Sequence, residues 1–143
     1  MRNQISKEIA TINQANARII NLYCEWVKSK GMNYNEFLIY YVLLEGNKTQ
    51  KELSLRTHLI KQTVNNIVKT MLLDGYVILQ DNPVDGREKY VVLTEKGNKK
   101  AHLVADELIE IENRVVEKMG KEVVQQLGNL SILFGNILEE EMK

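Results

Sequence analysis

The first thirty positions of the chain mix apolar and polar residues with a helical period. The apolar residues recur at spacings of three, four and seven, which puts them on one stripe of an α-helix. The stripe consists of Ile5, Ile9, Ile12, Ile19, Tyr23 and Trp26. We therefore expect an amphipathic helix over about residues 3–30, ended by Gly31.

Residues 33–82 carry helix start and stop signals at short intervals, which predicts a cluster of short helices. Asn35 is expected to cap the first of them, and Gly46 stops its broad apolar face. Thr49 and Glu52 have the spacing of a capping box, so the next helix begins almost at once. It is expected to end near Thr57 and His58, and another helix follows over about residues 61–74.

Two runs of β-branched and aromatic residues, at 76–79 and 90–93, predict a β-hairpin because turn signals lie between them. Thr94 is then expected to cap a further helix. Apolar residues keep a three-four rhythm to Met119, and Gly120 divides the C-terminal part into two helices. The pattern indicates a mainly α protein with a small β-hairpin.

The polar side of the helix expected at residues 61–74 suits a DNA major groove. Asparagine and glutamine can pair bidentately with adenine, and lysine can contact guanine or phosphate. No acidic side chain interrupts this side before Asp74. A solvated helix face would have a similar composition, but the tight helix junctions and the following hairpin favour DNA. The side consists of Lys61, Gln62, Thr63, Asn65, Asn66, Lys69 and Thr70.

The formal net charge of zero hides an uneven distribution along the chain. Between Lys48 and Lys69 the basic residues are opposed by Glu52 alone, whereas the C-terminal helices are rich in acidic residues. The basic residues are Lys48, Lys51, Arg56, Lys61 and Lys69. The sequence thus predicts a basic lobe and an acidic lobe, and the basic lobe coincides with the expected DNA-binding helix.

The end of the hairpin carries a sharper motif. Asp85-Gly86-Arg87 is followed by a strand and then by Leu93-Thr94-Glu95-Lys96-Gly97. In this context the chain resembles the MarR (multiple antibiotic resistance regulator) family of winged helix-turn-helix transcriptional regulators. The wing of that family has the pattern Asp-x-Arg, a short strand, and Leu-Thr-x-x-Gly. The resemblance covers essentially the whole chain.

The resemblance implies a winged helix-turn-helix core flanked by N- and C-terminal dimerisation helices. In a single domain, residues 33–97 would form the DNA-binding lobe, and residues 3–30 and 98–143 the helical dimerisation lobe. Arg87 would enter the minor groove or contact its phosphates, and Asp85 would orient it. The residues expected to contact DNA are Lys48, Thr49, Lys61, Gln62, Thr63, Asn65, Asn66, Lys69, Asp85, Arg87 and Lys89.

Two positions depart from the family pattern. Ile60 stands where similar sequences often have a helix-capping serine, so the recognition helix is expected to start differently. Asn66 stands where an arginine is common, so one phosphate or base contact is expected to be altered. Asp85 and Arg87 also have a simpler interpretation, a surface ion pair that only stabilises the turn.

Apolar stripes at the two ends of the chain indicate a homodimer, because family members resembling this chain pair through their terminal helices. The stripes have only each other and the helix after Thr94 to pack against, and a partner subunit would bury the remainder. A monomer with internal stripes is the alternative. A two-fold dimer predicts a pseudo-palindromic operator in double-stranded DNA. The expected dimerisation residues are Ile5, Ile9, Ile12, Leu127, Leu130, Phe134 and Leu138.

The resemblance further implies a regulator, most often a repressor, that is released or modulated by a small-molecule ligand. An aromatic or amphipathic molecule could lodge near Trp26, Tyr34, Phe37 and Tyr41, although the pattern of these residues favours ordinary core positions. Two other interpretations stay open. One is a winged-helix module that binds proteins, and the other is a thiol-based redox-sensing regulator that uses Cys24.

The sequence offers little support for catalysis. Cys24, His58 and His102 are widely separated, and no Gly-rich phosphate loop or nucleophile motif is present. We therefore expect no metal, no cofactor and no enzymatic activity. No apolar run is long enough to cross a bilayer, and the first ten residues lack a signal-like apolar block. A cytoplasmic protein without membrane contact is expected.

Overall fold

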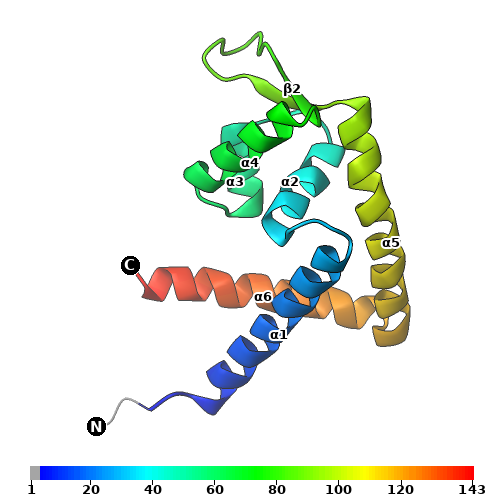
Figure 1. Ribbon diagram of the computed structural model, residues 1–143. Coiled ribbons are helices and arrows are strands. Elements are labelled where there is room, and N and C mark those ends of the chain that lie inside the picture. The colour runs from blue at the N-terminus through cyan, green and yellow to red at the C-terminus, as the bar shows by residue number, and fades with distance from the viewer. Residues whose placement is uncertain (1–3) are drawn as a thin grey trace. The chain divides into compact units, whose positions relative to one another are not determined.

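The computed structural model describes residues 4–143, which form six helices and three strands (Figure 1). In chain order these are α1 (Lys7–Ser29), α2 (Tyr34–Leu44), β1 (Lys48–Thr49), α3 (Gln50–Thr57), α4 (Lys61–Leu73), β2 (Val77–Gln80), β3 (Tyr90–Leu93), α5 (Glu95–Met119) and α6 (Lys121–Glu141). The fold is the predicted one, mainly helical with a small antiparallel sheet.

The predicted hairpin is present and is joined by a third strand. β2 and β3 pair antiparallel, with Val77 opposite Leu93 and Gln80 opposite Tyr90. β1 pairs with the other edge of β3, so the strand order is β1-β3-β2. The sequence did not reveal β1 because a strand of two residues has no alternation pattern to detect.

α2 begins earlier than the sequence predicted. Asn33, and not Asn35, is its N-cap, because the Oδ1 atom of Asn33 accepts a hydrogen bond from the backbone N–H of Glu36 at 2.8 Å. Asn33 has the extended backbone that a capping residue needs, with φ −85° and ψ 159°. Both asparagines have the right side chain for a cap, and the backbone conformation decides between them.

The junction of α3 and α4 is tight, as the sequence predicted. The capping box is present at the start of α3: Thr49 Oγ1 accepts from the Glu52 N–H at 3.1 Å, and Glu52 Oε1 accepts from the Thr49 N–H at 3.2 Å. α3 ends at His58, which has a left-handed backbone with φ 59°. This conformation turns the chain sharply and lets α4 start at Lys61.

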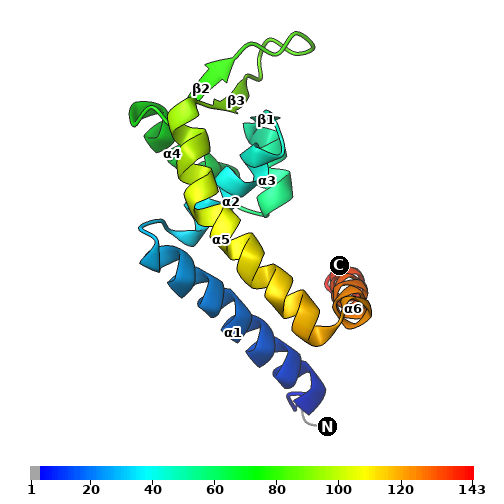
Figure 2. The ribbon, with the colours of Figure 1, turned by 90° about the vertical axis from the view of Figure 1, so that its right-hand side faces the viewer.

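The helix-turn-helix packs around a small core. Ile39 and Tyr40 from α2, Leu53 from α3 and Val64 and Val68 from α4 are all fully buried. Val91 of β3 and Val77 of β2 are buried as well. The loop between β2 and β3 extends beyond the helices in both views (Figures 1 and 2). The core therefore fixes α4 on its inner side and leaves the hairpin loop projecting.

The chain divides into two compact units, Met1–Val104 and Ala105–Lys143. α5 begins in the first unit and ends in the second, and Gly120, with φ 93°, separates α5 from α6 as the sequence predicted. α6 has no buried residue in this chain. The functional boundaries predicted from the sequence, a DNA-binding lobe over about residues 33–97 and a dimerisation lobe, stay predictions.

Candidate nucleic-acid interface

The recognition helix expected from the sequence is α4. Val64, Val68 and Met71 anchor its inner side, with at most 2% of each residue exposed. The side chains predicted to face DNA lie around the rest of the helix, outside this buried side. Of these, Lys61, Gln62, Asn66, Lys69 and Thr70 are exposed, and Thr63 and Asn65 are half-buried. Most of the polar side is therefore exposed to solvent.

The N-terminus of α4 has no side-chain cap. Ile60 occupies the N-cap position, is 70% exposed and has no side chain that could accept a hydrogen bond. The sequence had indicated an unusual start at this position. The first backbone N–H groups of α4 therefore lack a side-chain acceptor at the N-cap.

Amide side chains of α4 make hydrogen bonds within the protein. Gln62 Nε2 donates to Asn66 Oδ1 at 3.0 Å along the helix. Asn65 Nδ2 donates to Gln50 Oε1 of α3 at 3.3 Å. An amide can donate two hydrogen bonds and accept two, so each of these side chains keeps further positions for a base edge. The pairing with Gln50 ties the recognition helix to the start of α3.

Two predicted DNA contacts at the start of α3 differ in their surroundings. Lys48 is half-buried on β1, and its Nζ donates to the carbonyl oxygen of Gly46 at 3.5 Å. Thr49 is only 4% exposed, and its hydroxyl is the acceptor of the capping box. Thr49 was predicted to contact DNA, but its side chain is buried in the structure because it caps α3.

The hairpin loop holds Arg87 outward. Asp85 Oδ1 accepts from the Arg87 backbone N–H at 3.0 Å and lies 3.4 Å from Arg87 Nε. Asn82 Oδ1 steadies the turn by accepting from the N–H groups of Val84 at 2.9 Å and Asp85 at 3.3 Å. The Arg87 side chain is nevertheless 93% exposed. Asp85 thus orients the arginine without covering it.

Two predicted cations have carboxylate partners. Lys89 Nζ lies 2.6 Å from Asp81 Oδ1 within the hairpin, and this contact lowers the pKa of Asp81. Arg56 makes a two-pronged pair with Glu45, with N–O distances of 2.7 and 2.8 Å. The hydrogen bond from Arg56 lowers the pKa of the Glu45 carboxyl. Arg56 therefore adds less to the positive surface than the sequence suggested.

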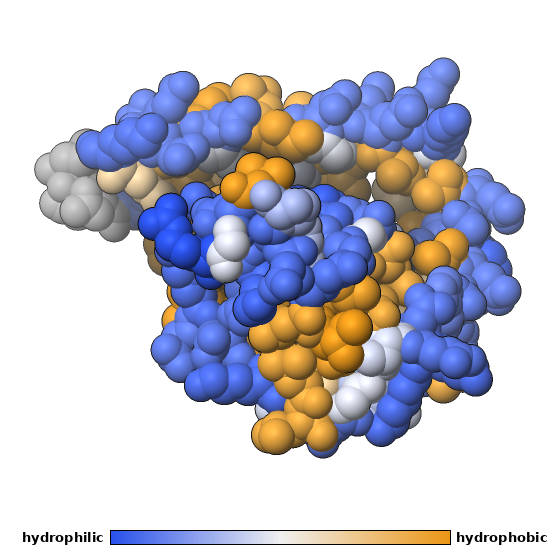
Figure 3. Space-filling model, turned by 90° about the horizontal axis from the view of Figure 1, so that it is seen from above, coloured by the Kyte–Doolittle hydropathy of each residue, from blue (hydrophilic) through white to orange (hydrophobic). Residues whose placement is uncertain are grey.

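Two hollows lie between the hairpin and the starts of α3 and α4. Each has a volume of about 290 Å³, and Gln50, Lys51 and Glu88 line both. Lys51 was predicted only as a basic residue, and Gln50 and Glu88 were not predicted to belong to the site. Their positions depend on the packing of the hairpin against the helices, which no local pattern encodes. Seen from the hairpin end, the molecule shows mainly hydrophilic residues around hydrophobic patches (Figure 3).

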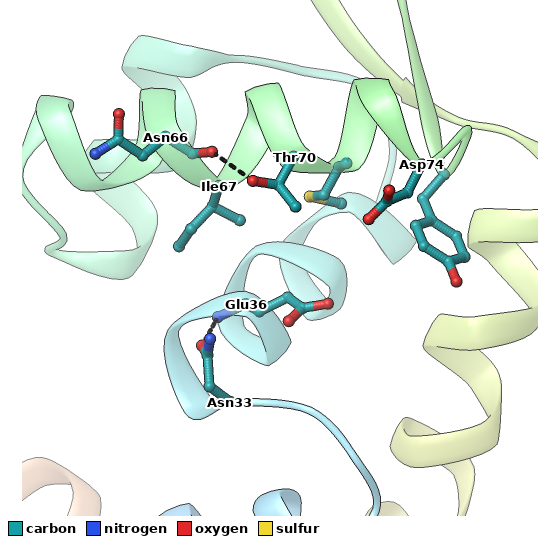
Figure 4. Close-up of a pocket in the computed structure, with 8 residues that line it drawn as sticks. Asn33, Glu36, Asn66, Ile67, Thr70 and Asp74 are labelled. Atoms are coloured by element: carbon teal, nitrogen blue, oxygen red, sulfur yellow. Dashed lines mark hydrogen bonds between the residues drawn. The ribbon is translucent and has the colours of Figure 1, made fainter.

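A groove of about 1070 Å³ lies within the first unit, between α1, the start of α2 and α4. Ile20, Cys24 and Lys28 come from α1, and Thr63 and Asn66 come from the recognition helix. A smaller hollow of about 200 Å³ adjoins α4. There Ile67 points from α4 toward the start of α2, where Asn33 and Glu36 lie (Figure 4). Both spaces are bordered by the recognition helix.

The four aromatic residues predicted to bind a ligand are separated by the fold. Tyr34 lines the large groove, whereas Trp26, Phe37 and Tyr41 do not. Phe37 is only 4% exposed and contacts Tyr41, with ring centroids 5.8 Å apart. Trp26 lies under Lys30 Nζ at 5.1 Å. The structure thus keeps Tyr34 as the candidate and places Phe37 in the core.

The predicted dimerisation residues are accessible in this chain. Ile5 is 84% exposed, Ile9 39% and Ile12 37% at the start of the chain. On α6, Leu127, Leu130 and Leu138 are 41–62% exposed, and Phe134 is half-buried. Each of these side chains is thus at least partly exposed in this chain, and Ile5 lies before the start of α1.

Within residues 4–143, no group of three or more His, Cys, Asp or Glu side chains could hold a metal ion. Cys24 is a half-buried free thiol in the wall of the large groove. Over the same residues, none of the helices is both long and apolar enough to span a membrane.

Comparison with known proteins gives a consistent result. Residues 30–88 match the model of the MarR family. A MarR family regulator from Neisseria meningitidis, NMB1585, has a TM-score of 0.87 at 25% identity, over 96% of this chain and 97% of that one. MarR of Staphylococcus aureus, in complex with salicylate and kanamycin, has a TM-score of 0.72 at 20% identity, over 94% and 92%.

CouR from Rhodococcus jostii RHA1, bound to p-coumaroyl-CoA, has a TM-score of 0.74 at 16% identity, over 90% of this chain and 92% of that one. No protein of curated function matches the sequence significantly. Residues 30–88 therefore match the MarR family, and the chain as a whole has the winged helix-turn-helix fold of a MarR family regulator.

Proposed function

We propose that this protein is a sequence-specific repressor that binds a pseudo-palindromic operator as a homodimer and is released or modulated by a small molecule. DNA binding is supported by one main observation: two surfaces suited to DNA occur in the same compact unit. One is the exposed polar side of α4, and the other is Arg87, held outward by Asp85. Together they match a major groove and the minor groove beside it.

The side chains of α4 favour DNA over a protein partner. Gln62 and Asn66 are exposed amides that can pair with adenine, and Lys61 and Lys69 can contact guanine or phosphate. Interfaces with proteins are instead enriched in aromatic residues and depleted in lysine at their centres. The exposed side of α4 therefore suits direct readout of base edges.

Binding to a duplex from the upstream region of the gene tests this part of the proposal. Arg87→Ala should weaken binding by roughly tenfold and reduce the slope of log K against log salt by about one, because one phosphate or groove contact is lost. Arg18→Ala, on the exposed surface of α1, is the matched control and should bind as the wild type does. An affinity indifferent to salt would contradict the proposal.

We propose that a second copy of the chain buries the exposed apolar residues of the N-terminal segment and of α6. α6 has no buried residue, although Leu127, Leu130 and Leu138 follow a helical period along it. Contiguous apolar surface of this kind on a protein surface marks an interaction site. A symmetric partner would present the same stripes and bury both sets. Two recognition helices would then read two half-sites.

The mass in solution tests the homodimer. Light scattering should give twice the 16.5 kDa of one chain. Leu130→Glu should shift the mass to that of one chain, because a buried unpaired charge opposes association. Asn136→Glu adds the same charge on the opposite side of α6 by helical periodicity and should leave the dimer intact. A wild-type protein that stays monomeric at micromolar concentration would remove this part of the proposal.

The large groove is the proposed effector site. Its walls come from both α1 and the recognition helix, so an occupant would bias the position of α4 relative to α1. Lys28 and Tyr34 in its wall suit an aromatic molecule with an anionic group. The S. aureus MarR and CouR structures hold salicylate and p-coumaroyl-CoA respectively, both of which carry an aromatic ring.

Salicylate is a suitable first probe for this site. It should lower the affinity of the wild type for DNA, and Lys28→Gln should weaken salicylate binding measured by calorimetry. Lys30→Gln is the control, because Lys30 lies over Trp26 and outside the groove. Equal effects of the two substitutions, or salicylate binding that leaves DNA affinity unchanged, would argue against this groove as the effector site.

A further inference from the structure

Glu88 places a carboxylate in the middle of the surface proposed for DNA. It lies one residue after Arg87 and is half-buried. It lines both hollows between the hairpin and the helices. The other side chains that line the first hollow are Gln50, Lys51, Lys61, Gln62 and Asn65. The second hollow is lined by Gln50, Lys51, Leu79, Arg87 and Lys89 as well.

The two cations next to Glu88 in the hairpin form ion pairs with other carboxylates. Arg87 pairs with Asp85, and Lys89 pairs with Asp81. Within residues 4–143 the Glu88 side chain makes no ion pair. Its charge is therefore not cancelled by a bonded partner and acts on whatever enters the two hollows.

A phosphate group in either hollow would meet this negative charge. Non-specific DNA binding comes almost entirely from attraction between basic side chains and phosphates. A carboxylate among those basic side chains repels phosphates, so it weakens binding at every position along the DNA that brings a phosphate close to it. Binding is not weakened at a position where the phosphates contact the surrounding lysines and stay away from Glu88. Specificity is a difference of affinities, so a selective penalty raises it.

We infer that Glu88 is a specificity-determining residue that weakens binding to unrelated DNA more than binding to the preferred sequence. This inference rests on the proposed DNA-binding function. It assigns Glu88 a role opposite in sign to that of Lys51 and Lys61, which line the same hollow. Removing the charge of Glu88 should make the protein bind DNA more tightly and less selectively.

The test compares two duplexes under identical salt: a 30-base-pair duplex of random sequence, and the best duplex that the wild type selects from a random library. Glu88→Gln keeps the size of the side chain and removes its charge. It should tighten binding to the random duplex by about fivefold and change binding to the selected duplex by less than about twofold. Glu88→Asp keeps the charge and should behave as the wild type.

Glu25→Gln is the control for net charge. Glu25 is exposed on α1 and lines neither hollow, so this change should leave the ratio of the two affinities unaltered. The inference is overturned if Glu88→Gln leaves random-duplex binding unchanged, weakens it, or tightens both duplexes equally. A wild type that binds neither duplex would instead overturn the proposed function itself. Thermal unfolding of each variant checks that the comparison is made on folded protein.

Discussion

Gly97 lies against the backbone of Tyr76, so closely that a Cβ atom on residue 97 would overlap the Tyr76 carbonyl oxygen. The same carbonyl accepts a hydrogen bond from the Thr94 N–H at 3.0 Å. Thr94 Oγ1 in turn accepts from the Gly97 N–H at 3.1 Å and donates to the Gly75 carbonyl at 2.7 Å. The Leu-Thr-x-x-Gly motif therefore joins the start of α5 to the beginning of the hairpin.

Replacing Gly97 by alanine should strongly destabilise the protein. The added methyl group would meet backbone atoms, which cannot move aside as a flexible side chain can. We expect a loss of about 2–3 kcal/mol in the free energy of unfolding, measured by urea denaturation. Gly86→Ala is the control, because a Cβ there meets no atom within 4 Å. Equal stability of the two variants would refute the close approach.

Ile60→Ser should stabilise the protein by supplying the missing cap of α4. Ile60 already has the extended backbone of an N-cap, with φ −67° and ψ 152°, and its side chain is mostly exposed. A serine hydroxyl there can accept from the unsatisfied N–H groups of the first turn, for a gain of about 1 kcal/mol. Ile60→Ala lacks the hydroxyl and should show no such gain in thermal unfolding. A serine variant no more stable than the alanine variant would contradict the prediction.

Tyr40→Phe should raise stability. Tyr40 is fully buried, and its hydroxyl has no hydrogen-bond partner among the residues that the structure describes. Burial, and then the charge of Glu36, raises the pKa of this hydroxyl. Removing a buried, unsatisfied hydroxyl should increase the free energy of unfolding by about 1 kcal/mol. Tyr40→Leu loses the ring as well and should be destabilising. A Phe variant clearly less stable than the wild type would show that the hydroxyl is satisfied.

The pair between Glu45 and Arg56 predicts a dependence of stability on pH. The hydrogen bond from Arg56 lowers the pKa of Glu45 below its ordinary value of 4.5 in the folded state. The stabilisation is therefore complete above pH 4.5 and is lost as the pH falls through the folded-state pKa. Arg56→Gln should raise the pKa of Glu45 in an NMR titration. Lys89→Gln is the control and should raise only the pKa of Asp81.

Local patterns were sufficient for the elements and for part of the site. The helical period of apolar residues located α4 and its exposed side, and the Asp-x-Arg motif located Arg87 at the turn. The capping box at Thr49 was also correct as local chemistry. However, the same residue was expected on the DNA-binding surface, and capping α3 instead draws it into the interior.

Other residues show where sequence reasoning stops. The choice between Asn33 and Asn35 depended on the backbone conformation, because both side chains can cap a helix. Four aromatic residues were equivalent in the sequence, yet only Tyr34 lines the large groove. No local pattern marks Glu88, and only the packing of the hairpin against α3 places it in one hollow with Lys51 and Arg87.

Local sequence was enough to locate the helices, the hairpin, the polar side of α4 and the arginine at the turn. These features follow from periodicity, caps and turns, which act between residues a few positions apart. Three outcomes came from the packing of the folded chain: Thr49 is buried, Tyr34 alone of the four aromatic residues lines the groove, and Glu88 shares its hollows with basic side chains. Those outcomes depend on contacts between distant segments, which arise when the core packs and are invisible in any local window.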